Sequence, residues 1–288
     1  MDTSRFETFP PGEFLPGANI EIIVPDIVRG RVRFALFDFD GTLSLIREGW
    51  QEVMIPMMVG ILARLGTGES REELSALVTD YVTRLTGKQT IYQMIELADQ
   101  VKRRGGDPLD PLDYKQMYLD LLWKRIEHRV QGLQEGSIQP DDMLVPGSRR
   151  LLELLAEAGV TMYLASGTDH PYVLSEAQAL QMDRFFGPRI YGALDNYKDF
   201  SKKMVIDRIL RENDLHGPEF CAFGDGYVEI EDAKSVGGIA IGVATEEEKR
   251  EGVNEWKRNR LIQAGADLII PDFREAEKVL EYLGVSGE

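Results

Sequence analysis

The sequence has one cysteine, few histidines and no long run of apolar residues. Cys221 is the only cysteine among 288 residues, so neither an intrachain disulfide nor a cysteine zinc cluster can form. The three histidines show no zinc-ligand spacing. The most apolar stretch, from Val53 to Ala63, is well short of the ~20 residues that a membrane-spanning helix needs. The N-terminal residues also lack the basic start and apolar core of a secretory signal. We therefore expect a cytoplasmic protein that does not enter a membrane.

Basic residues are scarce as well. The chain has 33 Lys and Arg against 49 Asp and Glu, a formal net charge of −16, and it contains no tract rich in Lys or Arg. Because nucleic acids and anionic membranes bind through clustered basic side chains, we expect neither as the main partner. A small anionic molecule is still compatible with this charge, since a few basic groups and a metal ion can reverse the local field.

The pattern of apolar residues changes twice along the first half of the chain. Residues 1–30 contain four prolines and little periodicity apart from a strand candidate at 22–24, and we predict an irregular extension. The apolar run at 33–37 predicts a buried strand. From about residue 48 to residue 130, apolar residues recur at helical spacing and no strand pattern appears. Helices are predicted there at 48–65, 70–85, 89–104 and 113–131, followed by a polar return linker at 131–146.

The second half alternates between short strands and helices. Strands are predicted at 160–165, 219–223, 238–243 and 267–270, and helices at 147–158, 170–181, 202–213, 228–236, 254–264 and 273–283. This alternation is typical of a parallel sheet with helices on both faces, in which ligands bind beyond the carboxyl ends of the strands. We predict an α/β fold whose core comprises residues 31–45 and 145–288, with a helical insertion at 46–144.

Two aspartates follow the first core strand directly. Asp38 and Asp40 are two positions apart, so in an extended segment both carboxylates lie on one side, and Gly41 permits a sharp turn after them. Aspartates often begin turns, but a turn does not require two acids after an apolar strand. A calcium loop is excluded, because its sixth and twelfth positions are Leu43 and Gly49 here.

A hydroxyl and a glycine follow the 160–165 strand. Ser166, Gly167 and Thr168 would place a hydroxyl and backbone amides at the start of a helix, where an anion can bind. Taken alone, this segment is explained as simply by a helix cap.

A lysine begins the helix predicted at 202–213. Lys202 shares a helix face with Val205, Ile206 and Ile209, which predicts that it begins the buried stripe. Its neighbour Lys203 lies about a third of a turn away. We favour Lys202 as a functional ammonium group, and the alternative of Lys203 stays open.

A second pair of acids follows the 219–223 strand. Asp225 stands between two glycines, which allow close approach of a ligand, and Glu229 lies one helical turn further on. Hard cations such as Mg²⁺ prefer carboxylate oxygens, and these two residues supply them. A dinucleotide fingerprint is excluded, because Glu229 occupies the position of its third glycine.

In this order, the four sites resemble the four motifs of the haloacid dehalogenase superfamily, in its phosphatase type with an α-helical (C1-type) cap. The residues that carry the resemblance are the DFDGT segment at 38–42, the turn at Ser166, Lys202 and the GDGYVE segment at 224–229. The resemblance covers residues 33–44 and about 145–288. It implies a Rossmann-like core sheet, and it implies that the helical insertion is a cap over the site.

The resemblance also implies a role for each motif. Asp38 would attack phosphorus and form an aspartyl-phosphate, and Asp40 would act as general acid and then as general base. Ser166, Gly167 and Lys202 would bind the phosphate group. Dehalogenases that attack carbon do not need an acid two residues after the nucleophile, so Asp40 favours phosphoryl transfer.

The metal site follows from the same resemblance. Mg²⁺ would be held by Asp38, the Asp40 carbonyl and Asp225, with Glu229 in an outer position. Substrate specificity would come from the cap and its hinge, where Arg47, Lys88 and Gln89 are the candidates. For the loop that carries Lys88, a plain helix connection is the competing interpretation.

These features predict a Mg²⁺-dependent phosphomonoester hydrolase that acts on a small soluble phosphorylated metabolite. A sugar phosphomutase resembling β-phosphoglucomutase would use the same aspartates and is the nearest alternative. A phosphonate hydrolase would also need a cap lysine that forms a Schiff base. A non-catalytic binding module with this fold is a further alternative, although a binding module has no use for a nucleophile and an acid together. The sequence leaves a homodimer open.

Overall fold

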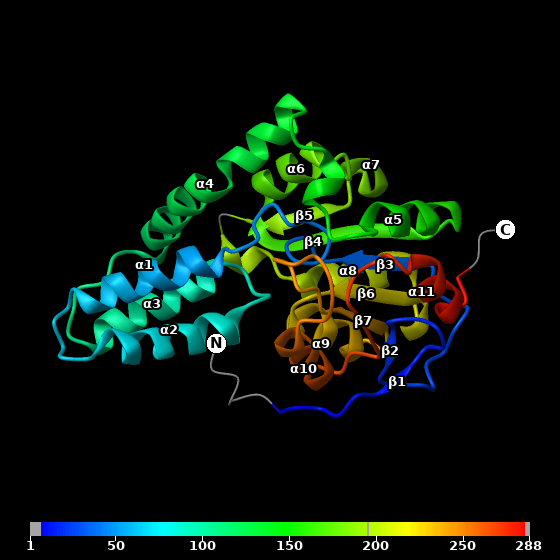
Figure 1. Cartoon of the computed structure of the whole chain (residues 1–288), viewed down its shortest axis with the longest axis horizontal. Helices are drawn as coiled ribbons and strands as arrows, with labels where there is room; N and C mark the ends of the chain where they lie inside the picture. The colour runs from blue at the N-terminus through cyan, green and yellow to red at the C-terminus, as the bar shows by residue number, and fades with distance from the viewer. Residues whose placement is uncertain (1–6, 195, 286–288) are drawn as a thin grey trace.

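One eight-stranded sheet organises the chain, which a computed structural model describes for residues 7–194 and 196–285 (Figure 1). The strand order is β1-β2-β8-β7-β6-β3-β4-β5, and the six strands from β8 to β5 run parallel. The strands are β1 (Glu13–Phe14), β2 (Glu21–Ile22), β3 (Phe34–Phe37), β4 (Thr161–Asp169), β5 (Ile190–Ala193), β6 (Phe220–Gly224), β7 (Ile239–Val243) and β8 (Leu268–Ile270). The predicted α/β class with a mostly parallel sheet is confirmed.

The helices follow the predicted ranges closely, except for the short α7. They are α1 (Gln51–Ala63), α2 (Arg71–Leu85), α3 (Ile91–Arg103), α4 (Pro111–Glu135), α5 (Ser148–Glu157), α6 (His170–Ala179), α7 (Asp183–Phe186), α8 (Lys202–Asn213), α9 (Tyr227–Ser235), α10 (Glu255–Gln263) and α11 (Ala276–Leu283). Short 3-10 turns lie at Pro140–Met143, Tyr197–Asp199 and Gly217–Glu219. None of the helices in the described part of the chain combines the length and apolar character of a membrane span.

Alternation along the strands sends side chains to two separate apolar cores. Phe37 and Phe223 stack at 4.7 Å between ring centroids on the face that α5 and α11 cover. Leu36 and Ala222, one position earlier in each strand, belong to the opposite core, with α8, α9 and α10. Because helices cover both faces, the carboxyl ends of the central strands are where a ligand can reach the sheet.

The helices α1 to α4 form the helical insertion, which lies between β3 and β4 in the chain and to one side of the sheet in space (Figure 1). A capping box begins α2: Glu73 N donates to Ser70 Oγ at 3.1 Å, and Ser70 N donates to the Glu73 carboxylate at 2.8 Å. The long helix α4 leads back toward α6, which it contacts. The insertion thus meets the core near the ends of the strands.

The N-terminal extension is more regular than the sequence indicates. Within the segment predicted as irregular, the strand candidate at 22–24 overlaps β2, and β1 and β2 pair with each other and continue the sheet antiparallel to β8. The reason is a buried ion pair: the Arg258 guanidinium donates two bonds of 2.6 and 2.7 Å to the carboxylate of Glu21. This long-range partner fixes β2 against the sheet edge, and it leaves no signal in the local sequence.

Candidate active site

Three adjacent strands bring the sequence-predicted residues together. Asp38 follows β3 at the middle of the sheet, Ser166 lies near the end of its neighbour β4, and Asp225 follows its other neighbour β6. Between these strand ends and the helical insertion lies a cavity of about 100 Å³. Its lining is Asp38, Asp40, Arg47, Trp50, Met54, Thr86, Gly87, Lys88, Thr90, Gln93, Tyr118, Ser166, Gly167, Thr168, Lys202 and Asp225.

Asp38 and Lys202 form a buried ion pair at the base of this cavity. The Lys202 ammonium lies 2.8 Å from Asp38 Oδ1 and 2.8 Å from Glu229 Oε2. The backbone N–H of Phe39 donates to the same Asp38 Oδ1 at 2.8 Å, while no donor in the described part of the chain holds Oδ2. Oδ2 is therefore the carboxylate oxygen that can act on a ligand.

Helix α8 puts Lys202 in this position. The side chain begins the buried stripe with Val205, Ile206 and Ile209, as its spacing predicts, and the Ser201 hydroxyl caps the helix by accepting from Met204 N. Lys203 points to solvent instead and pairs with Asp207, four residues further on.

Burial dominates the electrostatics of the pair. It raises the pKa of Asp38 well above its ordinary value; the nearby carboxylates of Glu229 and Asp225 add to the rise, and the Lys202 ammonium opposes it. Burial by itself would lower the pKa of Lys202, but Asp38 and Glu229 outweigh that effect and the pKa is raised. Lys202 is therefore a permanent cation, beside carboxylates that repel one another.

Asp40 is held by hydroxyl groups from β4. Its Oδ2 accepts from Thr168 Oγ1 at 2.8 Å and from Ser166 Oγ at 3.3 Å. Its Oδ1 is buried without a hydrogen-bond partner among the described residues, and Arg47 Nε is 3.8 Å away. An acid fixed on one oxygen and open on the other is suited to pass a proton to a ligand.

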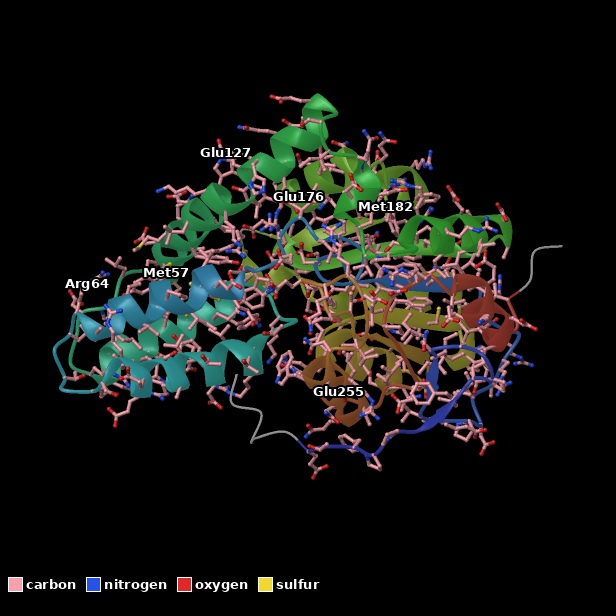
Figure 2. The ribbon with its side chains drawn as sticks, viewed as in Figure 1. Met57, Arg64, Glu127, Glu176, Met182 and Glu255 are labelled. Atoms are coloured by element: carbon pink, nitrogen blue, oxygen red, sulfur yellow. The ribbon has the colours of Figure 1, made fainter. Side chains whose placement is uncertain are left out.

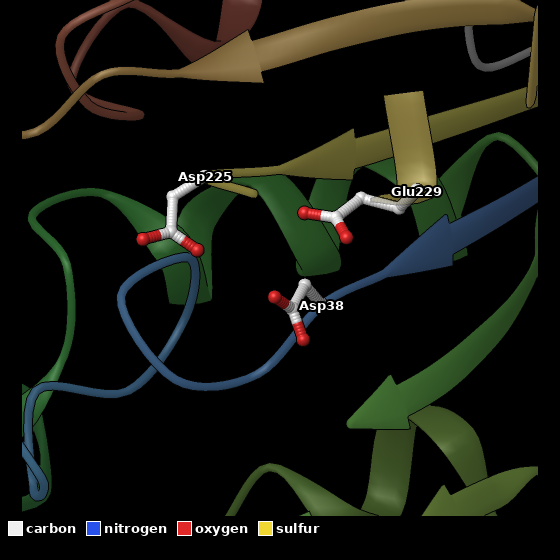
Figure 3. Close-up of side chains that lie close together, drawn as sticks. All are labelled: Asp38, Asp225 and Glu229. Carbon is white, nitrogen blue, oxygen red and sulfur yellow. The ribbon is translucent and has the colours of Figure 1, made fainter. Parts of the chain in front are cut away.

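The carboxylates of Asp38, Asp225 and Glu229 converge on one point, as Figure 3 shows. One oxygen from each lies within 4.8 Å of the others. Glu229 Oε1 accepts from Gly226 N at 2.8 Å and its Oε2 faces Lys202, whereas Asp38 Oδ2 has no donor among the described residues, so Asp38 is a more available ligand than Glu229. Hard carboxylate donors at this spacing fit a divalent cation.

Gly41 makes the approach of Asp225 feasible. It has a φ of +78°, and a Cβ there would lie 2.4 Å from Asp225 Oδ2. Thr42, the next residue, accepts from Asp225 N at 2.9 Å and donates to its Oδ1 at 3.3 Å. The DFDGT segment therefore supplies the turn and the hydroxyl that position Asp225, besides its own acids.

The segment from Ser166 to Thr168 does not begin a helix, contrary to the sequence analysis. Strand β4 continues to Asp169, which pairs with Ala193 of β5 after a register shift, and α6 begins only at His170. The reason is β5, which the sequence analysis missed and which extends the ladder. The Ser166 hydroxyl nevertheless faces the cavity and also accepts from Thr168 N at 3.1 Å.

The loop at residues 86–89, between α2 and α3, closes the cavity on the insertion side. A Cβ on Gly167 would lie 2.8 Å from the carbonyl oxygen of Lys88, so the glycine is needed for this contact. Lys88 lines the cavity, but Gln89 does not: its side chain is buried and donates to the carbonyl oxygens of Tyr197 at 3.0 Å and Phe200 at 2.7 Å. Of these two predicted specificity residues, only Lys88 faces the cavity.

Arg47 also faces the cavity, and it has a partner that the sequence analysis missed. Its guanidinium donates to both oxygens of Glu176, with Nη2 2.6 Å from Oε1. Glu176 is on α6, the helix that α4 contacts (Figure 2). Burial would lower the pKa of Arg47, but Glu176 and Asp40 outweigh it, so the guanidinium stays charged. The signal for Glu176 was present, because it lies on one face of α6 with Val173 and Ala177.

A second buried lysine contacts the site and was not predicted. Lys257 Nζ is 2.8 Å from Asp225 Oδ2 and 2.5 Å from Glu247 Oε1. Burial raises the pKa of Glu247, against the effect of the lysine. Neither residue belongs to a recognised motif, and α10, which carries Lys257, buries mostly polar residues and so lacks a clear apolar stripe.

This α/β fold has a cavity lined by carboxylates and a buried lysine, next to an acidic cluster that could hold a divalent cation. The family described as haloacid dehalogenase-like hydrolase matches residues 32–237, so the chain belongs to this family. The resemblance to this superfamily is thereby confirmed. None of the curated proteins compared with the chain matches it significantly.

Solved structures agree on the fold at low identity. A predicted phosphoglycolate phosphatase from Haemophilus somnus is 16% identical with a TM-score of 0.57, covering 86% of this chain and 98% of its own. CbbY from Rhodobacter sphaeroides in complex with xylulose-1,5-bisphosphate is 21% identical, with a TM-score of 0.53 and coverage of 85% and 96%. A putative β-phosphoglucomutase from Thermotoga maritima is 17% identical, with a TM-score of 0.51 and coverage of 87% and 99%.

Proposed function

We propose that this enzyme is a Mg²⁺-dependent phosphomonoester hydrolase that acts on a small phosphorylated metabolite. The observation that carries the proposal is the arrangement of two aspartates at one cavity. Asp38 has one oxygen fixed by Lys202 and Phe39 N and the other open, and Asp40 has one oxygen fixed by hydroxyls and the other without a partner. Asp38 is thus free on one oxygen to act as nucleophile, and Asp40 is free on one oxygen to act as general acid.

The first half of the reaction uses both aspartates. Asp38 Oδ2 attacks phosphorus, an oxygen–phosphorus bond forms on Asp38, and the bond to the ester oxygen breaks. Asp40, protonated at the start, gives its proton to the departing ester oxygen. The Ser166 hydroxyl, the Gly167 amide and the Lys202 ammonium bind the phosphate oxygens as charge develops on them.

The second half regenerates the enzyme. Asp40, now a carboxylate, takes a proton from a water molecule, and the resulting hydroxide attacks the phosphorus of the aspartyl-phosphate. The bond between phosphorus and Asp38 breaks, inorganic phosphate leaves, and Asp40 is protonated again.

The anionic site needs a cation for this chemistry. A carboxylate that approaches a phosphate meets a repulsion of ~4 kcal/mol per charge pair at 4 Å and an effective dielectric of 20. Mg²⁺ is the expected ion, held by Asp38, the Asp40 carbonyl and Asp225, with Glu229 outside them, and when bound it supplies the neutralising charge. The converging carboxylates in Figure 3 support this assignment.

The helical insertion acts as the cap in this proposal. It places Lys88, Tyr118 and Gln93 in the cavity, and Arg47 lines the same space from the hinge. A small polar metabolite suits these donors, and the limited volume argues against a bulky leaving group.

A sugar phosphomutase is the second candidate, because loop 86–89 is tied to the core on two sides. Arg260 Nη2 donates to Thr86 O at 3.0 Å, and Gln89 donates to the segment before Lys202. A loop held against the core in this way would help to keep water from the aspartyl-phosphate, which a mutase requires.

Phosphate release from a broad panel of phosphomonoesters, with and without Mg²⁺, tests the proposal. We expect Mg²⁺-dependent release that is lost in Asp38→Asn protein. Isomerised sugar phosphate without net phosphate release would support the mutase instead. Absence of both products across the panel would contradict both candidates.

A further inference from the structure

The metal-ligand candidate Asp225 is in contact with a largely buried pair of opposite charges, Lys257 and Glu247, that no motif includes. Lys257 Nζ bridges Asp225 Oδ2, at 2.8 Å, and Glu247 Oε1, at 2.5 Å. The three side chains are 10, 13 and 20% exposed for Lys257, Asp225 and Glu247, so water screens their charges only weakly. A cation bound at Asp225 would therefore interact with both members of the pair.

The segment between β7 and α10 delivers this pair to the site. It is closed by a bridge between Thr245 and Val253, and Glu247 lies within the excursion. Asn254 begins α10 by accepting from Lys257 N at 3.1 Å, and its amide also donates to Glu246 at 3.2 Å. These bonds place Lys257 in the first turn of α10, where its side chain reaches Asp225.

The two oxygens of Asp225 have different neighbours. Oδ1 accepts from the Thr42 hydroxyl, whereas Oδ2 accepts from the Lys257 ammonium. The ammonium neutralises Asp225 and repels any divalent cation that approaches it. Glu247 has the opposite effect on cation binding for two reasons. Its negative charge attracts the cation, and it still pairs with Lys257 when Asp225 binds the cation instead of the lysine.

We propose that Lys257 and Glu247 are positioning residues that set the divalent-cation affinity of the Asp38, Asp225 and Glu229 cluster, with opposite signs. Lys257 weakens cation binding and keeps Asp225 in place in the cation-free protein. Glu247 strengthens cation binding by serving as the second partner of Lys257. This inference deepens the proposed function and rests on its cation site.

Direct cation binding tests the inference without relying on activity. The full chain, stripped of cations with EDTA, is titrated with Mg²⁺ by calorimetry and with Mn²⁺ by electron paramagnetic resonance. Since removing a partner of a metal ligand commonly changes affinity 10- to 100-fold, we expect Glu247→Gln to raise Kd about tenfold or more. We expect Lys257→Met to lower Kd by a similar factor, and the double variant to return toward the wild-type value.

Matched variants separate charge from folding. Lys257→Arg keeps the charge and should keep Kd near the wild-type value, and Lys257→Gln is the second neutral variant if Lys257→Met does not fold. Lys234→Met is the control, since it breaks another ion pair, with the fully buried Asp267 at 2.7 Å, and should leave Kd unchanged. Thermal unfolding of each variant confirms that the protein used in the titration is folded.

The outcomes distinguish this inference from the proposed function. Folded Glu247→Gln and Lys257→Met proteins whose Kd moves in the same direction, or by less than twofold, would overturn it. A wild-type protein that binds neither ion would also overturn it. Opposite shifts in Kd, together with no hydrolysis of any phosphomonoester, would support the inference and contradict only the proposed function.

Discussion

The sheet side and the insertion side of the cavity are held together by different kinds of interaction. On the sheet side, Asp38, Lys202 and Glu229 are buried charges that pair with one another. On the insertion side, the loop at 86–89 is held through backbone carbonyl groups and close glycine contacts. Buried charges tolerate little change, because each depends on its partners. Backbone contacts accept many side chains. In the proposed function, the sheet side would therefore fix the reaction, and the insertion side would be free to define the substrate.

Replacement of Lys202 should have the largest effect on stability and turnover. It tests how strongly the sheet side of the cavity depends on its buried ion pairs. Lys202→Met leaves Asp38 and Glu229 buried without their cation, and we expect it to lower the free energy of unfolding by about 3–5 kcal/mol. Turnover should fall by roughly 100-fold or more. Denaturant unfolding and phosphate release measure the two effects.

Lys203→Met is the matched control for Lys202. Its side chain is 45% exposed and pairs only with Asp207, so the expected change in unfolding free energy is within about 0.5 kcal/mol. Equal effects of the two lysine variants would contradict the distinction between the buried and the exposed ammonium group.

Gly167→Ala tests the contact between the sheet side and loop 86–89 of the insertion side. A Cβ would lie 2.8 Å from Lys88 O, so the loop must move away, at a cost of about 1–3 kcal/mol. Because the displaced loop would carry Lys88 away from its place in the cavity, we expect KM to rise about 5- to 150-fold with a smaller change in kcat. An unchanged KM would mean that the position of loop 86–89 does not matter for binding.

Lys88→Ala should affect only the choice of substrate. No described carboxylate lies within ion-pair distance of Lys88, and its side chain lines the cavity. Loss of one exposed charge contact is worth about 1 kcal/mol, so KM should rise about fivefold for substrates with a second anionic group. Equal KM values for all good substrates in both proteins would remove Lys88 from the specificity residues.

The smallest expected effect is a loss of stability at acid pH that is confined to the helical insertion. The Arg104 guanidinium binds Glu69 through two hydrogen bonds and lowers the pKa of Glu69 to about 2 from its usual 4.5. A lowered pKa means that the stabilisation is present above pH 4.5 and is lost as the pH falls toward 2. Because the pair is partly exposed, its contribution stays below about 1 kcal/mol.

Glu69→Gln should remove this part of the pH dependence. The measurement is amide hydrogen exchange of α2 and α3 between pH 5 and pH 3. We expect the opening of these helices to become more frequent as the pH falls in the wild-type protein, and to depend less on pH in the variant. Identical profiles would show that the pair contributes nothing to the insertion.

Most of the core was predictable because its signals are local. The stripe of Lys202 with Val205 and Ile209, and the abrupt end of β3 at Asp38, are both readable from a few consecutive residues. The strand β5 was missed, because four residues that include Gly192 carry too little apolar pattern. The strand candidate at 22–24 overlaps β2, but β1 and the pairing of β2 with the sheet edge were missed, because that pairing depends on a distant arginine.

The site residues that were missed share one physical feature. Glu176 and Lys257 are charged side chains buried by pairing, and Glu247 is partly buried in the same way, whereas a charged residue in a sequence is ordinarily interpreted as exposed. Only Glu176 stands on an otherwise apolar helix face. The other two lie in a highly charged segment, where nothing local separates a buried charge from a solvated one.

Phosphorylation of Asp38 is the central claim, and trapping it is the most direct test. Protein mixed with a good substrate and Mg²⁺ is quenched in acid within milliseconds, digested and analysed by mass spectrometry. The account predicts one phosphoryl group on Asp38, increased in Asp40→Asn protein, where hydrolysis of the intermediate is slow, and absent from Asp38→Asn protein. A phosphoryl group on another residue, or steady turnover by Asp38→Asn protein, would contradict the account.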